Sequence, residues 1–371
     1  MSAPLVTCPH CESVVPEGNF CGHCGAHLAS GSARRTHAFA AAPSEPVARL
    51  ALISTLFPHL PRRRSGPFQV ALVAGAALVI LLAGMHLFAP ATVAASLLLP
   101  VLYLMYLYEV EIYEDEPWLV VGATMVIGAL LGVVFTVLAG GALSQLALTG
   151  DQAAGFMLAG IAVPVVAQAL MLSGPLFLYQ FRRRFYEPLD GLTFGAASGL
   201  GFSLASSLAT FWPLLAGPLV ASGSPLDWAL RLIATGLLVS VLNASTTALV
   251  AAAVWLHRYD RRRMHPWYAS VLAAVVAAFG VQVTLGVIGF VVQDLVLNVV
   301  ILAITALGLL LYVRLVIHDS LLVEGAEHEI GPDAQCPECH LVVPTMAFCP
   351  NCGAARTAQP KQRRPAVPVQ A

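Results

Sequence analysis

Charged residues are scarce in this sequence, and their scarcity excludes a soluble globular protein. They make up 11% of the 371 residues, whereas hydrophobic residues make up 58%. Soluble domains carry about 25% charged residues. So much apolar surface needs lipid to bury it, and the mean hydropathy of +0.79 agrees. The net charge of -1 gives no basic excess of the kind that binds nucleic acid.

Cysteine is absent from the hydrophobic middle of the chain. All eight cysteines fall into two clusters of four, one near each end. Clusters of this kind suit a reducing compartment and metal binding better than disulfide bonds. The sequence therefore predicts two small metal-binding modules that flank a membrane region.

The apolar residues form eight long runs. A helix that spans a bilayer needs about 20 mostly apolar residues. The runs are residues 68–89, 92–108, 118–140, 154–180, 192–212, 228–256, 267–292 and 295–317. Their number and length predict an all-α polytopic membrane protein with about eight transmembrane helices. The sequence leaves the ends of the second and seventh runs open.

The basic residues predict how these spans are oriented. They gather before the first run, between the fourth and fifth, between the sixth and seventh, and after the eighth, as in Arg62–Arg64, Arg182–Arg184 and Arg261–Arg263. Eight spans bring these groups to one face, which the positive-inside rule assigns to the cytosol. We therefore expect a multi-pass protein in the lipid bilayer of a prokaryotic plasma (inner) membrane, with both termini in the cytosol.

The two cysteine clusters share one spacing. Each has two Cys-x-x-Cys pairs that are separated by nine residues, and a glycine follows the second pair. The cysteines are Cys8, Cys11, Cys21 and Cys24 in the first module, and Cys336, Cys339, Cys349 and Cys352 in the second. Two such pairs complete a tetrahedral site of four thiolates, which suits zinc. We therefore predict two zinc ribbons, each with one structural zinc ion; a redox dithiol or disulfide pair is the alternative.

The two modules are near-copies, so we expect them to share one fold. Segments 14–16 and 342–344 both read Val-Val-Pro, and Phe20 recurs as Phe348. Because four cysteines already close each site, the nearby histidines are interpreted as solvated; these are His10, His23, His27 and His340. We expect the ribbons to bind a protein partner, with a lipid surface as an alternative, and we hypothesise that they pack together as one double-ribbon unit.

Composition divides the whole chain into six segments. They are the ribbons 1–30 and 336–356, the membrane core 68–317, the linkers 31–67 and 318–335, and a disordered tail 357–371. The first linker carries a short apolar stripe from Val47 to Phe57, followed by three arginines. This pattern predicts an interfacial helix with a polybasic anchor. A disordered linker is the alternative, because short helices are marginal alone.

Two stretches of the core resemble the PrsW family of intramembrane proteases. The first reads Glu-Asp-Glu-Pro-Trp and ends at Trp118, and the second runs from Tyr186 to Phe202 and contains Asp-Gly-Leu and Gly-Leu-Gly-Phe. The resemblance covers roughly residues 100–300. It implies a site inside the membrane that is built from acidic residues and histidine.

The residues that the resemblance implies are replaced in this chain. Ala167 and Gln168 stand where the family has paired glutamates, and Asn243 stands where a histidine is expected. Ser206 and Ser207 occupy the place of a Glu-Asn pair. Amides neither titrate nor hold zinc well, and a serine without an adjacent base is a poor nucleophile.

These replacements favour a non-catalytic protein with a degenerate PrsW-like core. We interpret it as a membrane scaffold or receptor whose cytosolic zinc ribbons dock a partner. The alternatives are an active intramembrane metalloprotease with substituted site residues and, with less support because buried charge is scarce, a transporter. The polar residues of the core would also serve as hydrogen-bonding contacts between helices.

Overall fold

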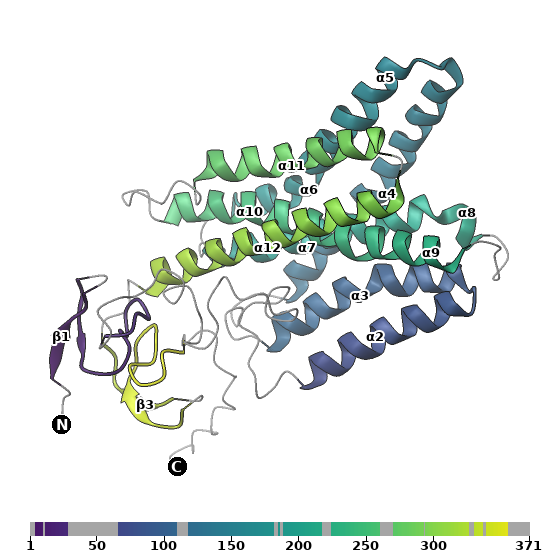
Figure 1. Cartoon of the computed structure of the whole chain (residues 1–371). Helices are drawn as coiled ribbons and strands as arrows, with labels where there is room; N and C mark the ends of the chain where they lie inside the picture. Colours follow the sequence, from purple (N-terminus) through teal and green to yellow (C-terminus); the bar gives the residue numbers. More distant parts are fainter. Residues whose placement is uncertain are drawn as a thin grey trace, which may run out of the picture. The chain divides into compact units, whose positions relative to one another are not determined.

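The protein is described here from a computed structural model (Figure 1). It describes residues 4–9, 12–28, 66–109, 118–181, 185, 188–216, 224–259, 270–292, 294–325, 330–336 and 339–354. The chain divides into unit 1 (Met1–Phe68, Met105–Glu114 and Ile317–Ala371) and unit 2 (Gln69–Leu104 and Asp115–Val316). The expected interfacial helix, polybasic anchor and disordered tail, and also His10 and Cys11, lie outside the described residues.

Helices make up almost all of unit 2. In chain order the helical elements are α2 (Gly66–Gly84), α3 (Phe88–Glu109), α4 (Trp118–Thr149), α5 (Gln152–Phe156), η2 (Met157–Ala162), α6 (Val163–Leu178), α7 (Pro188–Thr210), α8 (Trp212–Leu215), α9 (Pro225–Leu232), η3 (Ile233–Leu238), α10 (Val239–Tyr259), α11 (Val271–Val291) and α12 (Leu295–Gly325). Within the described chain, eight continuous helical stretches are long and apolar enough to cross a membrane. The predicted polytopic helical fold is therefore confirmed.

Several boundaries differ from those expected. Helix α2 ends at Gly84 instead of residue 89, α4 continues to Thr149 instead of residue 140, and α7 begins at Pro188 instead of residue 192. Helix α3 begins at Phe88 instead of residue 92, because a proline in the first turn costs no hydrogen bond. Helix α11 begins at Val271 instead of residue 267, because Ser270 is extended and its hydroxyl accepts the Ala273 N–H at 3.2 Å. Helix α12 continues to Gly325, into the expected linker 318–335.

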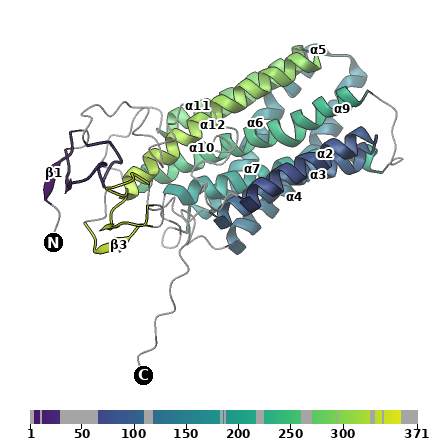
Figure 2. The same cartoon turned by 60° about the horizontal axis from the view of Figure 1, so that its bottom comes forward.

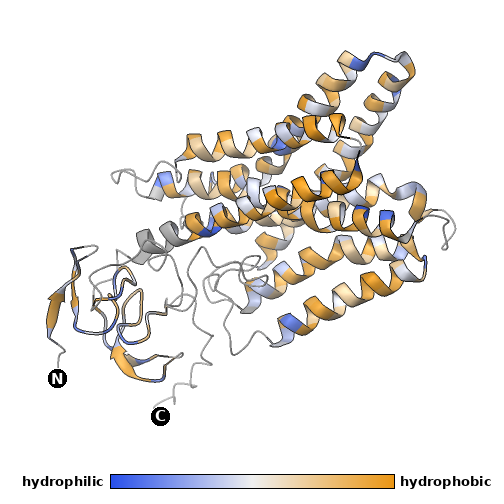
Figure 3. Ribbon diagram, in the orientation of Figure 1, coloured by the Kyte–Doolittle hydropathy of each residue, from blue (hydrophilic) through white to orange (hydrophobic). Residues whose placement is uncertain are grey.

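The long helices of unit 2 are hydrophobic along most of their length (Figure 3), and many of their large apolar side chains are exposed. Leu119 is 87% exposed, Leu272 is 74% exposed and Ile80 is 71% exposed. Helices satisfy their own backbone groups, so this apolar surface is suited to lipid. The chain is a multi-pass membrane protein.

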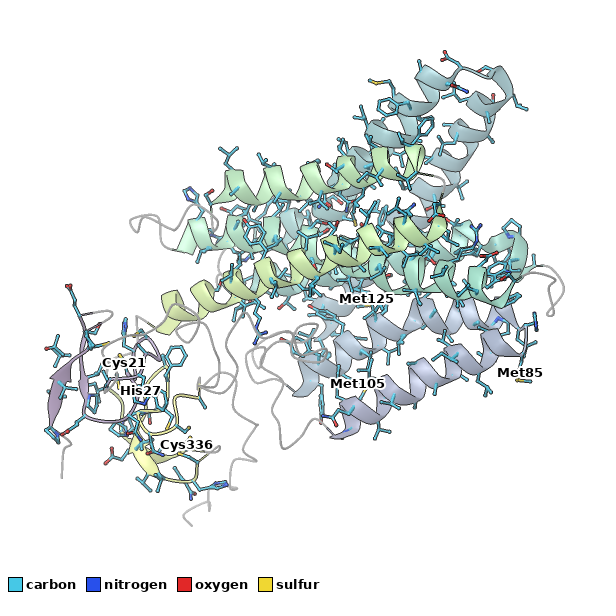
Figure 4. The ribbon with its side chains drawn as sticks, in the orientation of Figure 1. Cys21, His27, Met85, Met105, Met125 and Cys336 are labelled. Carbon is cyan, nitrogen blue, oxygen red and sulfur yellow. The ribbon has the colours of Figure 1, made fainter. Side chains whose placement is uncertain are left out.

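Helix α7 packs against both α4 and α10 through small residues (Figures 1 and 2). A Cβ atom on Gly195 would lie 2.7 Å from the Ala248 Cα of α10, and one on Gly199 would lie 2.6 Å from the Asn243 carbonyl oxygen. On the other side, a Cβ on Gly201 would collide with the carbonyl of Met125, which Figure 4 labels on α4. Glycine therefore lets the three backbones approach closely, as small residues do in membrane helices.

Unit 1 contains two short antiparallel hairpins. Strands β1 (Leu5–Thr7) and β2 (Val14–Pro16) pair in the first module, and β3 (Asp333–Gln335) and β4 (Val342–Pro344) pair in the second. The second module therefore begins before residue 336, the boundary expected from the first cysteine. Each module needs a strand ahead of its first cysteine to complete the hairpin.

The close approach of α7 to α10 predicts the effect of a single added side chain. We expect Gly195→Val to lower the free energy of unfolding by about 1–3 kcal/mol, because the α10 backbone cannot yield to it. The measurement is thermal unfolding of the protein in detergent. Gly289→Val on α11 is the control, since a Cβ there meets nothing within 4 Å. Equal melting of the two variants would contradict the packing described.

Candidate metal centres and a buried polar cluster

The cysteines converge in both modules. In the second module the sulfurs of Cys336, Cys339, Cys349 and Cys352 all lie within 4.8 Å of one another. In the first module those of Cys8, Cys21 and Cys24 do the same, and Cys11 is outside the described residues. Figure 4 labels Cys21 and Cys336, one cysteine of each module.

The sulfur geometry suits a tetrahedral metal ion. The Sγ atoms of Cys339 and Cys349 lie 3.8 Å apart, and those of Cys336 and Cys352 lie 3.9 Å apart. In the first module Cys8 and Cys24 are separated by 3.8 Å. A zinc ion with sulfur ligands at about 2.3 Å gives tetrahedral edges of about 3.8 Å. Both cysteine clusters could therefore bind a metal.

The second cysteine pair of each module favours a thiolate. A hydrogen bond from Cys24 lowers the pKa of the Cys21 thiol to about 5, against the opposing effect of burial. A hydrogen bond from Cys352 likewise lowers the pKa of Cys349 to about 5, and the same bond raises the pKa of Cys352. The thiolate is the form of cysteine that binds metal, so the lowered pKa of Cys21 and of Cys349 favours metal binding in each module.

The two modules share the same backbone turns after their cysteine pairs. Gly25 and Gly353 follow the second cysteine pairs, and each has φ of 71°. Glu12 and His340 follow the first pairs with φ of 59° and 60°. The N–H of each of these four residues donates to the carbonyl of the first cysteine of its pair at 2.8–2.9 Å. The repeat seen in sequence is therefore a repeat of structure.

The histidines of the modules differ in their surroundings. His340 is exposed, as expected. His23 and His27 are half-buried, and their Nδ1 atoms are buried without a hydrogen-bond partner, which corrects the interpretation of these two side chains as solvated. For His27 the cause is an edge-to-face contact with the Phe20 ring, with 4.9 Å between centroids.

The two modules contact each other within unit 1. The Phe20 N–H donates to the Pro350 carbonyl at 2.9 Å, and the Phe348 N–H donates to the Gly22 carbonyl at 2.8 Å. Met346 of the second module packs into the core of the first. The described residues of the two modules therefore contact each other through backbone hydrogen bonds and through an apolar side chain.

A polar cluster lies buried between helices of unit 2, and Gln168 of α6 is one of its fully buried members. Its side chain is 0% exposed. Its Oε1 atom accepts the hydroxyl of Thr246 at 2.9 Å and the Nε2 of Gln282 at 3.2 Å, and its Nε2 donates to Thr247 at 3.4 Å. Both threonines belong to α10 and Gln282 belongs to α11, so Gln168 joins three helices.

Asn243 of α10 extends the cluster to α7. Its Nδ2 donates to the Ser203 hydroxyl at 2.8 Å, and its Oδ1 accepts Gln282 Nε2 at 2.8 Å. The Gln282 nitrogen also lies 3.3 Å from the Thr246 hydroxyl. One amide nitrogen is therefore surrounded by three oxygen atoms, from Gln168, Asn243 and Thr246.

Sequence reasoning found part of this cluster. Gln168 and Asn243 meet through Gln282, whereas Ala167 is half-buried beside the cluster. Ser206 donates to the Ser203 carbonyl of its own helix, and Ser207 is buried on α7. The serine that bonds Asn243 is Ser203, which the sequence comparison did not select. Ser203 lies on the same face of α7 as Gly195 and Gly199, which contact α10. The spacing of four residues between these positions could have identified Ser203 from the sequence.

A π-helical segment directly precedes each of the two helices that supply Gln168 and Asn243. η2 (Met157–Ala162) runs into α6, and η3 (Ile233–Leu238) runs into α10. π-helical turns are rare and occur often at functional sites. This shared irregularity indicates that the cluster occupies a specialised place in the fold.

Comparison with known proteins identifies the core. A family model described as PrsW family intramembrane metalloprotease matches residues 116–313. The matched segment contains the whole polar cluster and neither cysteine module. No curated protein and no solved structure matches the chain.

The shared nitrogen of Gln282 predicts a loss of stability when it is removed. Gln282→Leu takes away the donor to Gln168 and Asn243, and we expect the free energy of unfolding to fall by about 0.6–2 kcal/mol. Thermal unfolding in detergent measures it. Gln145→Leu is the matched control, because Gln145 is exposed near the end of α4. An unchanged melting temperature for Gln282→Leu would show that the cluster contributes nothing to stability.

Proposed function

The chain belongs to the PrsW family of intramembrane metalloproteases, and from this premise we propose that it is a non-catalytic member of that family. In this proposal the core is a membrane scaffold or receptor that binds a membrane segment, a lipid or a partner helix. The zinc ribbons present a docking surface in the cytosol. The observation that carries the proposal is the neutral polar cluster around Gln282.

The cluster does not fit the metal that the family name implies. Its members are carboxamides and hydroxyls, from Gln168, Asn243, Gln282, Ser203, Thr246 and Thr247. Zinc sites in proteins use thiolate, imidazole and carboxylate ligands. The three oxygens that converge already share the Gln282 nitrogen as a donor. In low-dielectric surroundings a divalent ion held by neutral groups would carry a large desolvation cost.

The cluster also lacks a group that could activate water. A general base must titrate near the working pH, and none of these side chains does. Ser203 accepts a hydrogen bond from an amide, Asn243, which cannot take its proton. The cluster therefore supports a structural role, in which it fixes the register of α6, α7, α10 and α11.

The cysteine modules support the second half of the proposal. Their sulfur spacing suits one zinc ion each, and a site with four cysteine ligands is structural because no coordination position stays open. Orientation with both modules in the cytosol rests on the arginine groups of the sequence. A prokaryotic plasma membrane is the compartment we propose.

Metal analysis distinguishes this proposal from an active metalloprotease. We expect two zinc ions per purified chain, falling to one in Cys8→Ser. The double variant Gln168→Ala with Asn243→Ala should keep both, because the core holds no metal. A third metal ion that is lost in this double variant would support an active site and refute the proposal.

A cleavage assay gives an independent test of the same point. Purified protein in lipid vesicles is incubated with transmembrane peptides and the products are analysed by mass spectrometry. We expect no cleavage above the level of the Gln168→Ala variant. Cleavage by the natural chain that disappears in Gln168→Ala would show that the core is catalytic after all.

A further inference from the structure

The contact between the two modules has a local two-fold symmetry. Its two hydrogen bonds run from Phe20 N–H to the Pro350 carbonyl and from Phe348 N–H to the Gly22 carbonyl. Phe20 and Phe348 are equivalent positions of the repeat, and so are Gly22 and Pro350, since each pair differs by 328 in number. Exchanging the two modules therefore turns one hydrogen bond into the other. The same relation holds in a symmetric dimer, where both subunits use the same surface.

The side chains at this contact break the symmetry. A Cβ atom on Gly22 would collide with the sulfur of Met346, which is 7% exposed and lies in the core of the first module. Across the axis, a Cβ atom on Gly18 would lie 2.6 Å from the carbonyl oxygen of Pro350. Gly18 is the repeat counterpart of Met346. At both places the first module has glycine and the second has the larger residue.

This distribution decides which modules can pair. Two copies of the first module would set glycine against glycine at both places and would lose the burial of Met346. Two copies of the second module would set Met346 against Pro350 at both places, where there is room only opposite a glycine. The mixed pair alone fills both places without overlap, so the alternatives are disfavoured by gaps or by clashes.

We propose that the two ribbons are a matched pair, in which the N-terminal ribbon recognises the C-terminal ribbon of the same chain. The pairing joins the two ends of the chain. It also makes the first ribbon depend on the second, because Met346 completes the core around Cys8, Cys21 and Cys24 of a module too small to build its own. The proposal is independent of whether the membrane core cleaves peptides.

Exchange of the large and small residues tests the pairing in the full-length protein. A photo-crosslinking amino acid replaces Asn19, which is exposed and whose Nδ2 lies 3.4 Å from the Asn351 carbonyl oxygen. We expect a crosslink to the peptide around Asn351 within one chain. In the variant that combines Gly18→Met with Gly22→Pro, the yield should fall roughly tenfold or more, from the lost burial of Met346.

Adding Met346→Gly and Pro350→Gly to that variant should restore the crosslink, because the large and small residues then meet again with their roles exchanged. Zinc analysis of each variant shows whether both modules remain folded. An undiminished yield in the first variant overturns the proposal. So does an exchanged chain with both zinc ions but no crosslink. With mixed chains that carry two different tags, crosslinks between chains would overturn pairing within one chain.

Zinc release gives a second measurement that needs no crosslinker. In the presence of a chelator, Met346→Ala should release the zinc of the first module about tenfold faster than the natural chain does, although its own module keeps all four cysteines. Leu341→Ala is the control, because Leu341 belongs to the same module and is 52% exposed. Equal release from the natural chain and Met346→Ala would refute the dependence of one ribbon on the other.

Discussion

The satisfaction of polar groups inside the membrane is the constraint on which the helical core depends. No water is available there, so an amide or hydroxyl that faces lipid costs several kcal/mol, as a general rule. The core meets this constraint by bringing its polar side chains together. Gln168 is completely buried, yet both of its polar atoms are bonded. The Gln282 nitrogen serves Gln168 and Asn243 at once, so α6, α10 and α11 cannot slide past one another without breaking it.

The same constraint explains why the packing glycines and the polar cluster occur together. Asn243 reaches Ser203 across the α7–α10 contact, and that contact is close because Gly195 and Gly199 have no side chains. A short amide can bridge two helices only when their backbones are near. Close packing and hydrogen bonding therefore depend on each other, as in other membrane helices. The hydrogen-bonding groups of the cluster are already bonded to one another, so few of them are left to polarise a substrate. This favours the structural role over the catalytic one.

Much of this could be predicted from the sequence, for reasons that differ between the two units. The eight spans follow from composition, since length and hydropathy are enough in a bilayer. The cysteine sites follow from spacing, because two Cys-x-x-Cys pairs separated by nine residues are typical of a metal site and of few other structures. Ser203 was missed, because its side chain turns toward Asn243 only once it is known that α7 crosses α10 at Gly195 and Gly199, the glycines four and eight residues before it. The strand at Asp333–Gln335 was missed although the first module has its counterpart at Leu5–Thr7.

The contact between the modules shows how a repeat can specify its own partner. An exact duplication would allow each module to pair with itself or with another chain equally well. Here the two copies have diverged where they touch, with Gly18 and Gly22 on one side and Met346 and Pro350 on the other. Divergence at these places costs nothing in metal binding, because the cysteines and the residues of left-handed conformation are kept. The divergence changes only which modules can pair with each other. Because this contact covers part of both ribbons, an outside partner would have to bind the part that it leaves uncovered.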